Sequence, residues 1–216
     1  MEDPKPLQTS RVFPILKPSM TQQLPQTCEP ALLEQFLKAE SMALWLVRSA
    51  QTQDVPPGVL QFLRRHEEEE SRHLQQFEQL LGMTSRGKTA LLRVPSQWCV
   101  LAVQLYGYEA LGYQFAKLLV AVRPDLSSIL DDEEVHVQFF ENEVRKLLAH
   151  EGSWAEGARQ AARAWRRRLP RTVDRYLDYE TFTPFRDDLR RSILDAIDQR
   201  FSGIHLLPVP EGGVSS

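Results

Sequence analysis

The chain has 216 residues, of which 42% are hydrophobic and 25% are charged, and its formal net charge is −3 at pH 7. This length and apolar content fit one domain with extensions, or at most two small domains, and are enough for a sizeable core. The nearly balanced charge argues against a nucleic-acid partner, because nucleic-acid binders usually carry a clearly basic surface. The two cysteines are too few for a disulfide framework or a four-thiolate metal site, and they favour a reducing compartment.

The N-terminal segment does not resemble a targeting signal. It begins Met-Glu-Asp-Pro-Lys, without the basic start or the apolar core of a signal peptide. No stretch of about 18 residues is apolar without interruption, so we expect no membrane span and a soluble, cytoplasmic protein. Residues 1–29 contain five prolines and no helical period, which predicts a Pro-rich N-terminal arm.

From Pro30 onward the sequence has helical periodicity. Apolar residues recur on one face of four long segments. We place the first at about 30–50, and the second after the turn at 54–58 and through 81. The third covers about 97–122 and the fourth about 126–150. Gly82 and Pro124 end the second and third segments. Two shorter apolar stripes follow, one from Trp154 to Leu169 and one from Leu189 to Phe201, before a Gly/Pro/Ser-rich flexible tail at 208–216. No stretch alternates with a period of two, so the predicted class is all-α.

One carboxylate interrupts the most hydrophobic helix. Glu109 is the only charged residue between Arg93 and Lys117. Burying a carboxylate by itself costs several kcal/mol, so Glu109 should be paired, protonated or bound to a metal. The alternative is a structural Glu satisfied by a neighbouring Arg or Tyr. Tyr106 and Tyr113 flank it one turn away on either side, and we interpret them as core residues, with hydrogen bonding to a ligand or radical relay as the other role.

A carboxylate and an imidazole recur at the same spacing in two other helices. Glu70 precedes His73 by three residues, and Glu133 precedes His136 by three. Residues at this spacing share a helix face, so each pair presents both groups to one point. The alternative is a solvated charged face, especially for the run at 67–70. Aromatic neighbours on the faces of both histidines favour the core.

The first helix contributes a further carboxylate, because Glu40 lies on its apolar stripe between Phe36 and Leu44. The four long helices therefore offer Glu, Glu-x-x-His, Glu and Glu-x-x-His, in that order. Four carboxylates and two imidazoles that converge in a bundle are a ligand set for two adjacent iron or manganese ions, and without metal they would make a costly core. The predicted metal ligands are Glu40, Glu70, His73, Glu109, Glu133 and His136.

This ordered set resembles the ferritin-like diiron-carboxylate superfamily, which includes ferritins, rubrerythrins and diiron oxygenases and oxidases. The resemblance implies a ferritin-like four-helix bundle over residues 30–150, with two additional C-terminal helices in an extension over 151–207. It implies two Fe ions, with Mn or a mixed Mn/Fe pair as the alternative. It also implies that Glu70 and Glu133 bridge the metals and that Glu40 and Glu109 are more terminal. The segment 57–82 is similar to the corresponding stretch of demethoxyubiquinone hydroxylases, at the level of the superfamily.

The function that the resemblance implies is an oxygen-activating diiron oxidoreductase, an oxygenase or oxidase that uses dioxygen or peroxide on a small-molecule organic substrate. The chain has no rubredoxin-like cysteine module, so a separate electron donor protein is expected. Two alternatives stay open: iron or peroxide handling, as in a ferroxidase or a rubrerythrin, and a metal-free helical interaction scaffold. Rubrerythrins often have a second Glu three residues after the helix-three ligand, but Gly112 stands there. A homodimer also stays open.

Helix depth raises one difficulty for this site. Glu109 lies farther from the turn at 123–124 than Glu133 does, a mismatch of about 7 Å at roughly 1.5 Å per residue. An early end to the third helix or a π-bulge would absorb this mismatch. Otherwise Glu133 is displaced, and Asp132 or Glu134 takes its place.

Two further groups of polar residues are interpreted as surface features. His66 and His150, each with Leu three residues earlier, are expected at the surface. An arginine-rich stretch is expected to form a solvated face balanced by local acids, with an anionic partner such as a phosphate-bearing molecule or RNA as the alternative. Its members are Arg163, Arg166, Arg167, Arg168 and Arg171.

Overall fold

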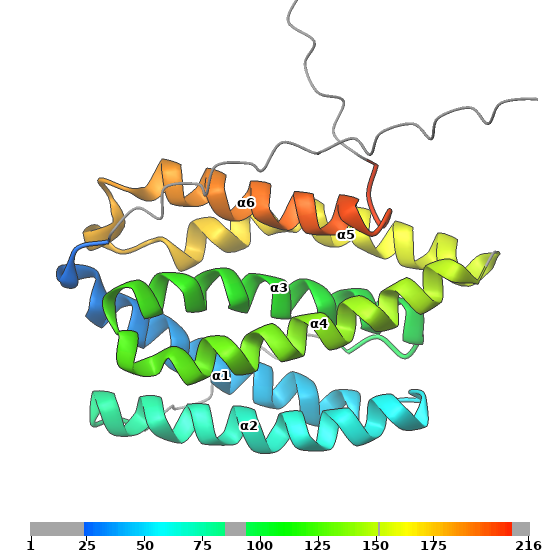
Figure 1. The fold of residues 1–216 in the computed structure, drawn as a ribbon, viewed down its shortest axis with the longest axis horizontal. Helices are drawn as coiled ribbons and strands as arrows, with labels where there is room; N and C mark the ends of the chain where they lie inside the picture. The colour runs from blue at the N-terminus through cyan, green and yellow to red at the C-terminus, as the bar shows by residue number, and fades with distance from the viewer. Residues whose placement is uncertain (1–23, 85–93, 151, 209–216) are drawn as a thin grey trace, which may run out of the picture.

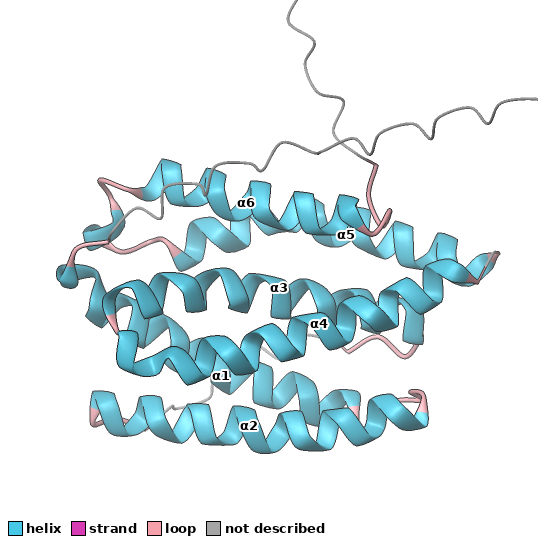
Figure 2. Cartoon of the chain, in the orientation of Figure 1, coloured by secondary structure: helices cyan, strands magenta, loops and turns pink. Residues whose placement is uncertain are grey.

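The computed structural model describes residues 24–84, 94–150 and 152–208. These ranges contain helices and no strand, which confirms the predicted all-α class (Figure 2). No helix in them is long and apolar enough to cross a membrane. The α-helices are α1 (Glu29–Ala50), α2 (Pro57–Leu81), α3 (Trp98–Val122), α4 (Ser127–Ala149), α5 (Ser153–Tyr176) and α6 (Arg186–Gly203). Short 3-10 helices cover Gln26–Cys28, Pro124–Leu126 and Glu180–Phe182.

Proline and glycine set the helix ends that the sequence predicts. Pro30 lies in the first turn of α1 and Pro57 opens α2, where a missing N–H costs nothing. Gly82 ends α2 in the left-handed conformation, with φ of 61°, and its N–H donates to the carbonyl of Gln79. Pro124 separates α3 from α4 and begins a 3-10 turn. The predicted ends of the four long helices are correct to within about one residue.

The helices lie in three layers (Figure 1). α1 pairs with α2, α3 pairs with α4, and α5 with α6 covers the outer side of the α3–α4 layer. α1 also contacts α3, and α2 contacts α4, so the first four helices surround a common interior. α3 lies in the middle layer and contacts α1, α4, α5 and α6. This position explains why its sequence is almost wholly apolar.

Close packing of α5 on α3 depends on a glycine. A Cβ atom at Gly107 would lie 2.4 Å from the ring of Trp165, so any side chain there would require the Trp165 ring or α5 itself to shift. Beside it, Tyr106 stacks on Phe201 with ring centroids 4.9 Å apart, and its hydroxyl donates to Glu141 at 3.0 Å. Tyr106 is thus a core residue whose polar atom has found a partner, as the sequence predicts.

The ends of the chain and the start of α5 differ in part from expectation. Most of the predicted arm, residues 1–23, lies outside the described residues, as does the tail after 208. The last part of the arm is already ordered, because Leu24 and Cys28 are buried. Trp154, expected on the buried stripe of α5, is instead 51% exposed, because that stripe begins one residue later at Ala155. The proposed boundaries at 30, 150 and 207 stay predictions.

Candidate metal centre

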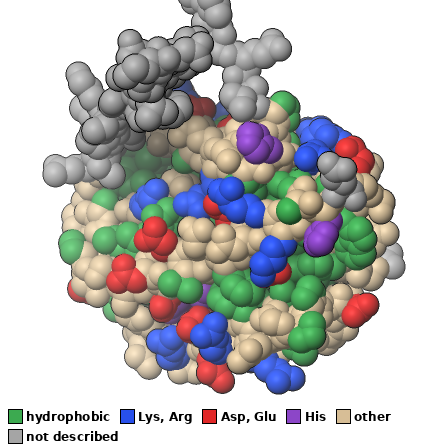
Figure 3. Space-filling model, turned by 45° about the vertical axis from the view of Figure 1, so that its right-hand side comes forward, with side chains coloured by type: hydrophobic (Ala, Val, Ile, Leu, Met, Phe, Trp, Pro, Cys, Tyr) green, Lys and Arg blue, Asp and Glu red, His purple; other side chains and the backbone are tan. Residues whose placement is uncertain are grey.

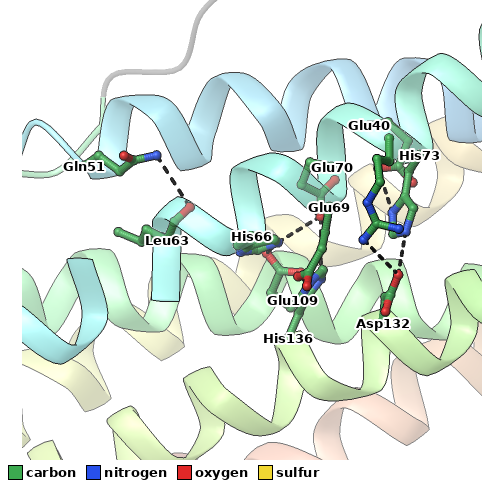
Figure 4. A network of polar contacts seen from close by, with 11 residues as sticks. Glu40, Gln51, Leu63, His66, Glu69, Glu70, His73, Glu109, Asp132 and His136 are labelled. Atoms are coloured by element: carbon green, nitrogen blue, oxygen red, sulfur yellow. Dashed lines mark hydrogen bonds and ion pairs between the residues drawn. The ribbon is translucent and has the colours of Figure 1, made fainter. Parts of the chain in front are cut away.

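All six predicted ligands are at most 5% exposed. Figure 4 shows five of them, Glu40, Glu70, His73, Glu109 and His136, in the space between the helices. They form two clusters, in each of which one ligand atom per residue lies within 4.8 Å of the others. We call these clusters the first and second positions. The first position consists of His66, Glu70, Glu109 and His136, and the second of Glu40, Glu70, His73 and Glu133.

Glu70 belongs to both positions, as expected of a bridging carboxylate. Glu133, for which the resemblance also implies bridging, lies in the second position only. The depth mismatch between Glu109 and Glu133 is therefore taken up by placing them in different positions along the bundle. α3 is an unbroken α-helix to Val122, so neither an early end nor a π-bulge is present. Neither Asp132 nor Glu134 belongs to either cluster.

The prediction that His66 lies at the surface is wrong, because its side chain is fully buried. Its Nε2 atom lies 2.8 Å from Oε1 of Glu70, and its ring centroid lies 3.8 Å from that of His136. Phe62, four residues earlier, and Glu70, four residues later, are both buried on the same face of α2. The spacing His66-x-x-x-Glu70-x-x-His73 was the available signal. His150 is exposed, as predicted.

Each of the two predicted histidine ligands has one ring nitrogen in contact with a carboxylate from another helix, outside the clusters. His136 of α4 contacts Glu69 of α2, and His73 of α2 contacts Asp132 of α4. Nε2 of His136 lies 2.8 Å from Oε2 of Glu69, and Nε2 of His73 lies 3.0 Å from Oδ2 of Asp132. A metal-binding histidine commonly donates its second N–H to a carboxylate, which fixes the tautomer and the ring orientation. Here the arrangement leaves Nδ1 of both rings facing the clusters, with Nδ1 of His136 at 3.6 Å from Oε1 of Glu70.

The clusters concentrate buried polar atoms that have no partner. Buried polar groups are nearly always hydrogen-bonded, so several orphaned atoms at one place indicate a partner of another kind. Nitrogen lone pairs and carboxylate oxygens are the donors that bind iron and manganese. In the described part of the chain, the buried side-chain atoms without a hydrogen bond are Oε2 of Glu40, Oε2 of Glu70, Nδ1 of His73 and Nδ1 of His136. Nδ1 of His66 also has none, but Nε2 is the atom of that ring that meets Glu70 and Glu109.

The charge balance of the two positions also fits cations. Their four carboxylates carry a formal charge of −4 when ionised, which two divalent cations would neutralise. No Lys or Arg in the described ranges forms an ion pair with any of them.

In the metal-free protein, burial and the charge of Glu70 raise the pKa of Glu40 well above its ordinary value and that of Glu133 to about 8. Burial likewise raises the pKa of Glu109.

In the metal-free site, Glu70, the carboxylate shared by both positions, has a lowered pKa, while several groups around it have raised pKa values and hold protons. Burial opposes ionisation of Glu70, but hydrogen bonds with Glu40 and His66 lower its pKa below the ordinary range. Burial also opposes protonation of His136, yet the bond with Glu69 and the nearby carboxylates raise its pKa to about 9. His66 has a lowered pKa, first because it is buried and second because His136 is close. The metal-free site thus holds protons where cations would bind.

A cavity of about 70 Å³ leads to the carboxylates of both positions between α1 and α3. Glu40, Glu109 and Glu133 lie at its inner side. Most of the remaining lining is apolar: Phe36, Ala39, Met42, Ala43, Trp45, Leu46, Leu111 and Phe115. Several of these, including Met42 and Trp45, are half-buried and lie towards the surface. A volume of this size has room for several water-sized molecules.

Few uncharged polar groups face this cavity. Gln35 is buried and lines it. The phenol groups of Tyr108 and Tyr176 also contribute to the lining. These three side chains are the uncharged polar groups that could orient a bound molecule beside the carboxylates.

Gly112 makes room for the second position. A Cβ atom there would lie 2.8 Å from Oε2 of Glu133, which is shorter than any ordinary contact. The volume that a second α3 carboxylate would use is thus taken by Glu133 from α4. This packing accounts for the departure from the rubrerythrin pattern at position 112.

Two arginines of the arginine-rich stretch in α5 have local acidic partners. Arg166 donates to Asp198 of α6 at 2.7 Å, and Arg163 donates to Glu156 at 2.9 Å. On the face shown in Figure 3, Lys and Arg side chains lie among Asp and Glu side chains. These contacts fit the predicted solvated face.

Comparison of the chain with protein-family models, curated protein sequences and solved structures finds no match. The fold and the site therefore rest on the geometry itself. That geometry is an all-helical protein with two buried His/Glu clusters that could hold metal ions.

Proposed function

We propose that α1–α4 form a ferritin-like four-helix bundle with a dinuclear metal centre, and that α5 and α6 are additions to it. The support is the convergence of one Glu or one Glu/His pair from each of the four helices, with Glu70 common to both positions. Iron is the metal we expect, with manganese in one or both positions as the alternative. The residues of the two positions would hold two reduced iron ions, which would supply the electrons for dioxygen activation.

The proposed activity is the oxidation of a small apolar organic molecule. The observation that carries this choice is the cavity, whose lining beside Glu40, Glu109 and Glu133 is mostly apolar. An apolar passage admits dioxygen and apolar substrates and gives no ligands to a hydrated iron ion. A ferroxidase would need such ligands along its route. We therefore favour an oxygenase or oxidase over iron handling, with electrons from a separate donor protein.

The chain's own residues would position and protect this reaction. Glu69 and Asp132 hold the two outer nitrogens of His136 and His73, so that both rings present Nδ1 to the centre. The apolar side chains of the cavity keep bulk water away from the carboxylates. Carboxyls with raised pKa, such as Glu133, would release their protons when cations bind.

The direct test is the metal content of freshly purified wild-type protein, Glu109→Ala and Glu134→Ala, after iron-supplemented expression. We expect close to two metal ions per chain in the wild type, a large loss in Glu109→Ala, and no loss in Glu134→Ala, whose side chain is exposed. Negligible metal in the wild type after anaerobic reconstitution would overturn the proposal.

The choice between the two reactions needs a second measurement. Reduced protein should consume dioxygen in proportion to its bound iron. Oxidation of many further Fe²⁺ equivalents per chain, with an iron mineral as the product, would instead favour the ferroxidase alternative.

A further inference from the structure

We propose that His66 is a third imidazole ligand, which makes the two metal positions chemically unequal and gives the first position a stronger preference for iron over manganese than the second. This inference rests on the proposed dinuclear centre. The first position offers two imidazoles and two carboxylates, whereas the second offers one imidazole and three carboxylates. Glu70 counts in both.

The geometry around His66 supports a ligand rather than a packing residue. Its Nε2 atom lies 2.8 Å from Oε1 of Glu70 and 3.7 Å from Oε1 of Glu109, the two carboxylates of the first position. Nδ1 of His136 lies 3.8 Å from the other oxygen of Glu109. The two imidazoles therefore reach the same pair of carboxylates from α2 and α4, so a cation between those carboxylates would meet both rings.

His66 differs from the other two histidines in how it is held. No carboxylate contacts its outer nitrogen, and Nδ1 of His66 has no hydrogen bond in the described part of the chain. Its orientation comes instead from packing, with the ring of Phe62 at 5.6 Å and that of His136 at 3.8 Å between centroids. In the metal-free protein, Nε2 bonds to Glu70. A cation in the first position would take over that nitrogen.

The difference in donors predicts a difference in metal preference. For a given set of nitrogen and oxygen ligands, iron(II) binds more tightly than manganese(II), and imidazole favours iron while carboxylate suits manganese. Replacing one carboxylate by an imidazole therefore raises the iron-to-manganese ratio at the first position. Loaded from an equal mixture, the chain should hold iron at the first position and a larger share of manganese at the second.

The test loads the full-length metal-free protein anaerobically with equal concentrations of Fe²⁺ and Mn²⁺. Anomalous diffraction at the iron and manganese edges then gives the occupancy of each metal at each position. We expect a several-fold higher iron-to-manganese ratio at the first position, because it has one more imidazole and one fewer carboxylate than the second. Equal ratios at the two positions, with both filled, would overturn this inference and leave the proposed function standing.

Two variants separate a ligand from a residue that only positions Glu70. His66→Gln keeps an amide that can hydrogen-bond to Glu70 but lacks the imidazole, and His66→Asn shortens it. If His66 is a ligand, the iron-to-manganese ratio at the first position falls in both variants to about that of the second position. Wild-type selectivity in His66→Gln would overturn the inference. His150→Gln, an exposed histidine at the end of α4, is the matched control and should behave like the wild type.

Separate measurements distinguish a variant that does not fold from a failure of the proposed function. Circular dichroism checks that each variant keeps its helix content, and the wild-type occupancies test the inference even if a variant does not fold. A wild-type protein that binds neither metal would overturn the proposed function and this inference with it.

Discussion

Asp132 and His73 come from different helices, α4 and α2, and meet at 3.0 Å on the outer side of the second position. Asp132 was considered from the sequence as a replacement for Glu133, but in the structure it contacts the histidine instead. It is about one-third exposed, and Arg72 lies 3.9 Å away. Asp132 thus connects the buried centre to the surface.

Asp132→Asn should weaken metal binding at the second position. The amide keeps the shape but removes the negative charge that makes the His73 ring more basic, and such outer partners are worth about 10–100-fold in affinity. Titration of the metal-free variant with Mn²⁺ or Fe²⁺ measures the change. Asp131→Asn, the exposed neighbour, is the matched control. Equal affinities in the two variants would contradict the role given to Asp132.

Gly112→Ala should displace the carboxylate of Glu133. The added Cβ would lie 2.8 Å from Oε2, so either the carboxylate or α3 must shift. We expect a folded protein that loses about one of its two metal ions, seen by metal analysis together with circular dichroism. Gly203→Ala in α6 has open space around the new Cβ and should keep both ions. Full loading of Gly112→Ala would show that the contact is not limiting.

The metal-free protein should lose stability as the pH rises from 7 to 9. The pKa of Glu133 is about 8 in the folded protein against an ordinary 4.5, and that of His136 is about 9 against 6.5. The folded state therefore binds more protons than the unfolded state in this window, so the free energy of unfolding falls as pH increases. Thermal unfolding of metal-free protein at pH 7, 8 and 9 measures this. Metal-loaded protein should show a smaller decline, because cations replace those protons.

Xenon should bind in the cavity between α1 and α3. An apolar lining of this kind stays accessible to small apolar atoms, and xenon is an established probe of such spaces. Pressurised crystals of the wild type should show xenon beside Leu111, and Ala43→Phe should abolish it by filling the cavity. Ala121→Phe places the same ring on the exposed side of α3 and serves as the control. Xenon retained in Ala43→Phe would mean that the passage lies elsewhere.

Gly107→Ala should destabilise the contact of α5 with α3. The Cβ would lie 2.4 Å from the Trp165 ring, and overpacking of this kind costs about 1–3 kcal/mol. Urea unfolding monitored by tryptophan fluorescence gives the difference in free energy. Stability equal to the wild type would mean that Trp165 rotates away at no cost.

Much of this architecture follows from local sequence patterns. Gly82 and Pro124 mark helix ends because their backbone chemistry allows few alternatives. Glu109 stands out because a charge inside an apolar helix needs a partner, and the Glu-x-x-His spacing places two groups on one face whatever the surroundings. Together with the apolar stripe that carries Glu40, these signals predict six of the seven residues in the two clusters.

The remaining features depend on packing between helices. The Leu three residues before His66 predicts a surface position. Phe62 and Glu70, which share the face of His66 at four-residue spacing, indicate that it is buried. The contact of Asp132 with His73 spans 59 residues of sequence and depends on how α2 and α4 are aligned. The cavity depends on the distance between α1 and α3, which no local pattern contains.

The position of α3 between two layers links the outer part of the fold to the chemistry. Its inner face carries Glu109, and its outer face receives Trp165 at Gly107, only two residues away. A rigid helix transmits a shift on one face to the other because both faces share one backbone. A mutation at Trp165, which packs on the outer side of α3, should therefore be detectable as a change in metal occupancy, so that the outermost layer acts as a mechanical support for the innermost atoms.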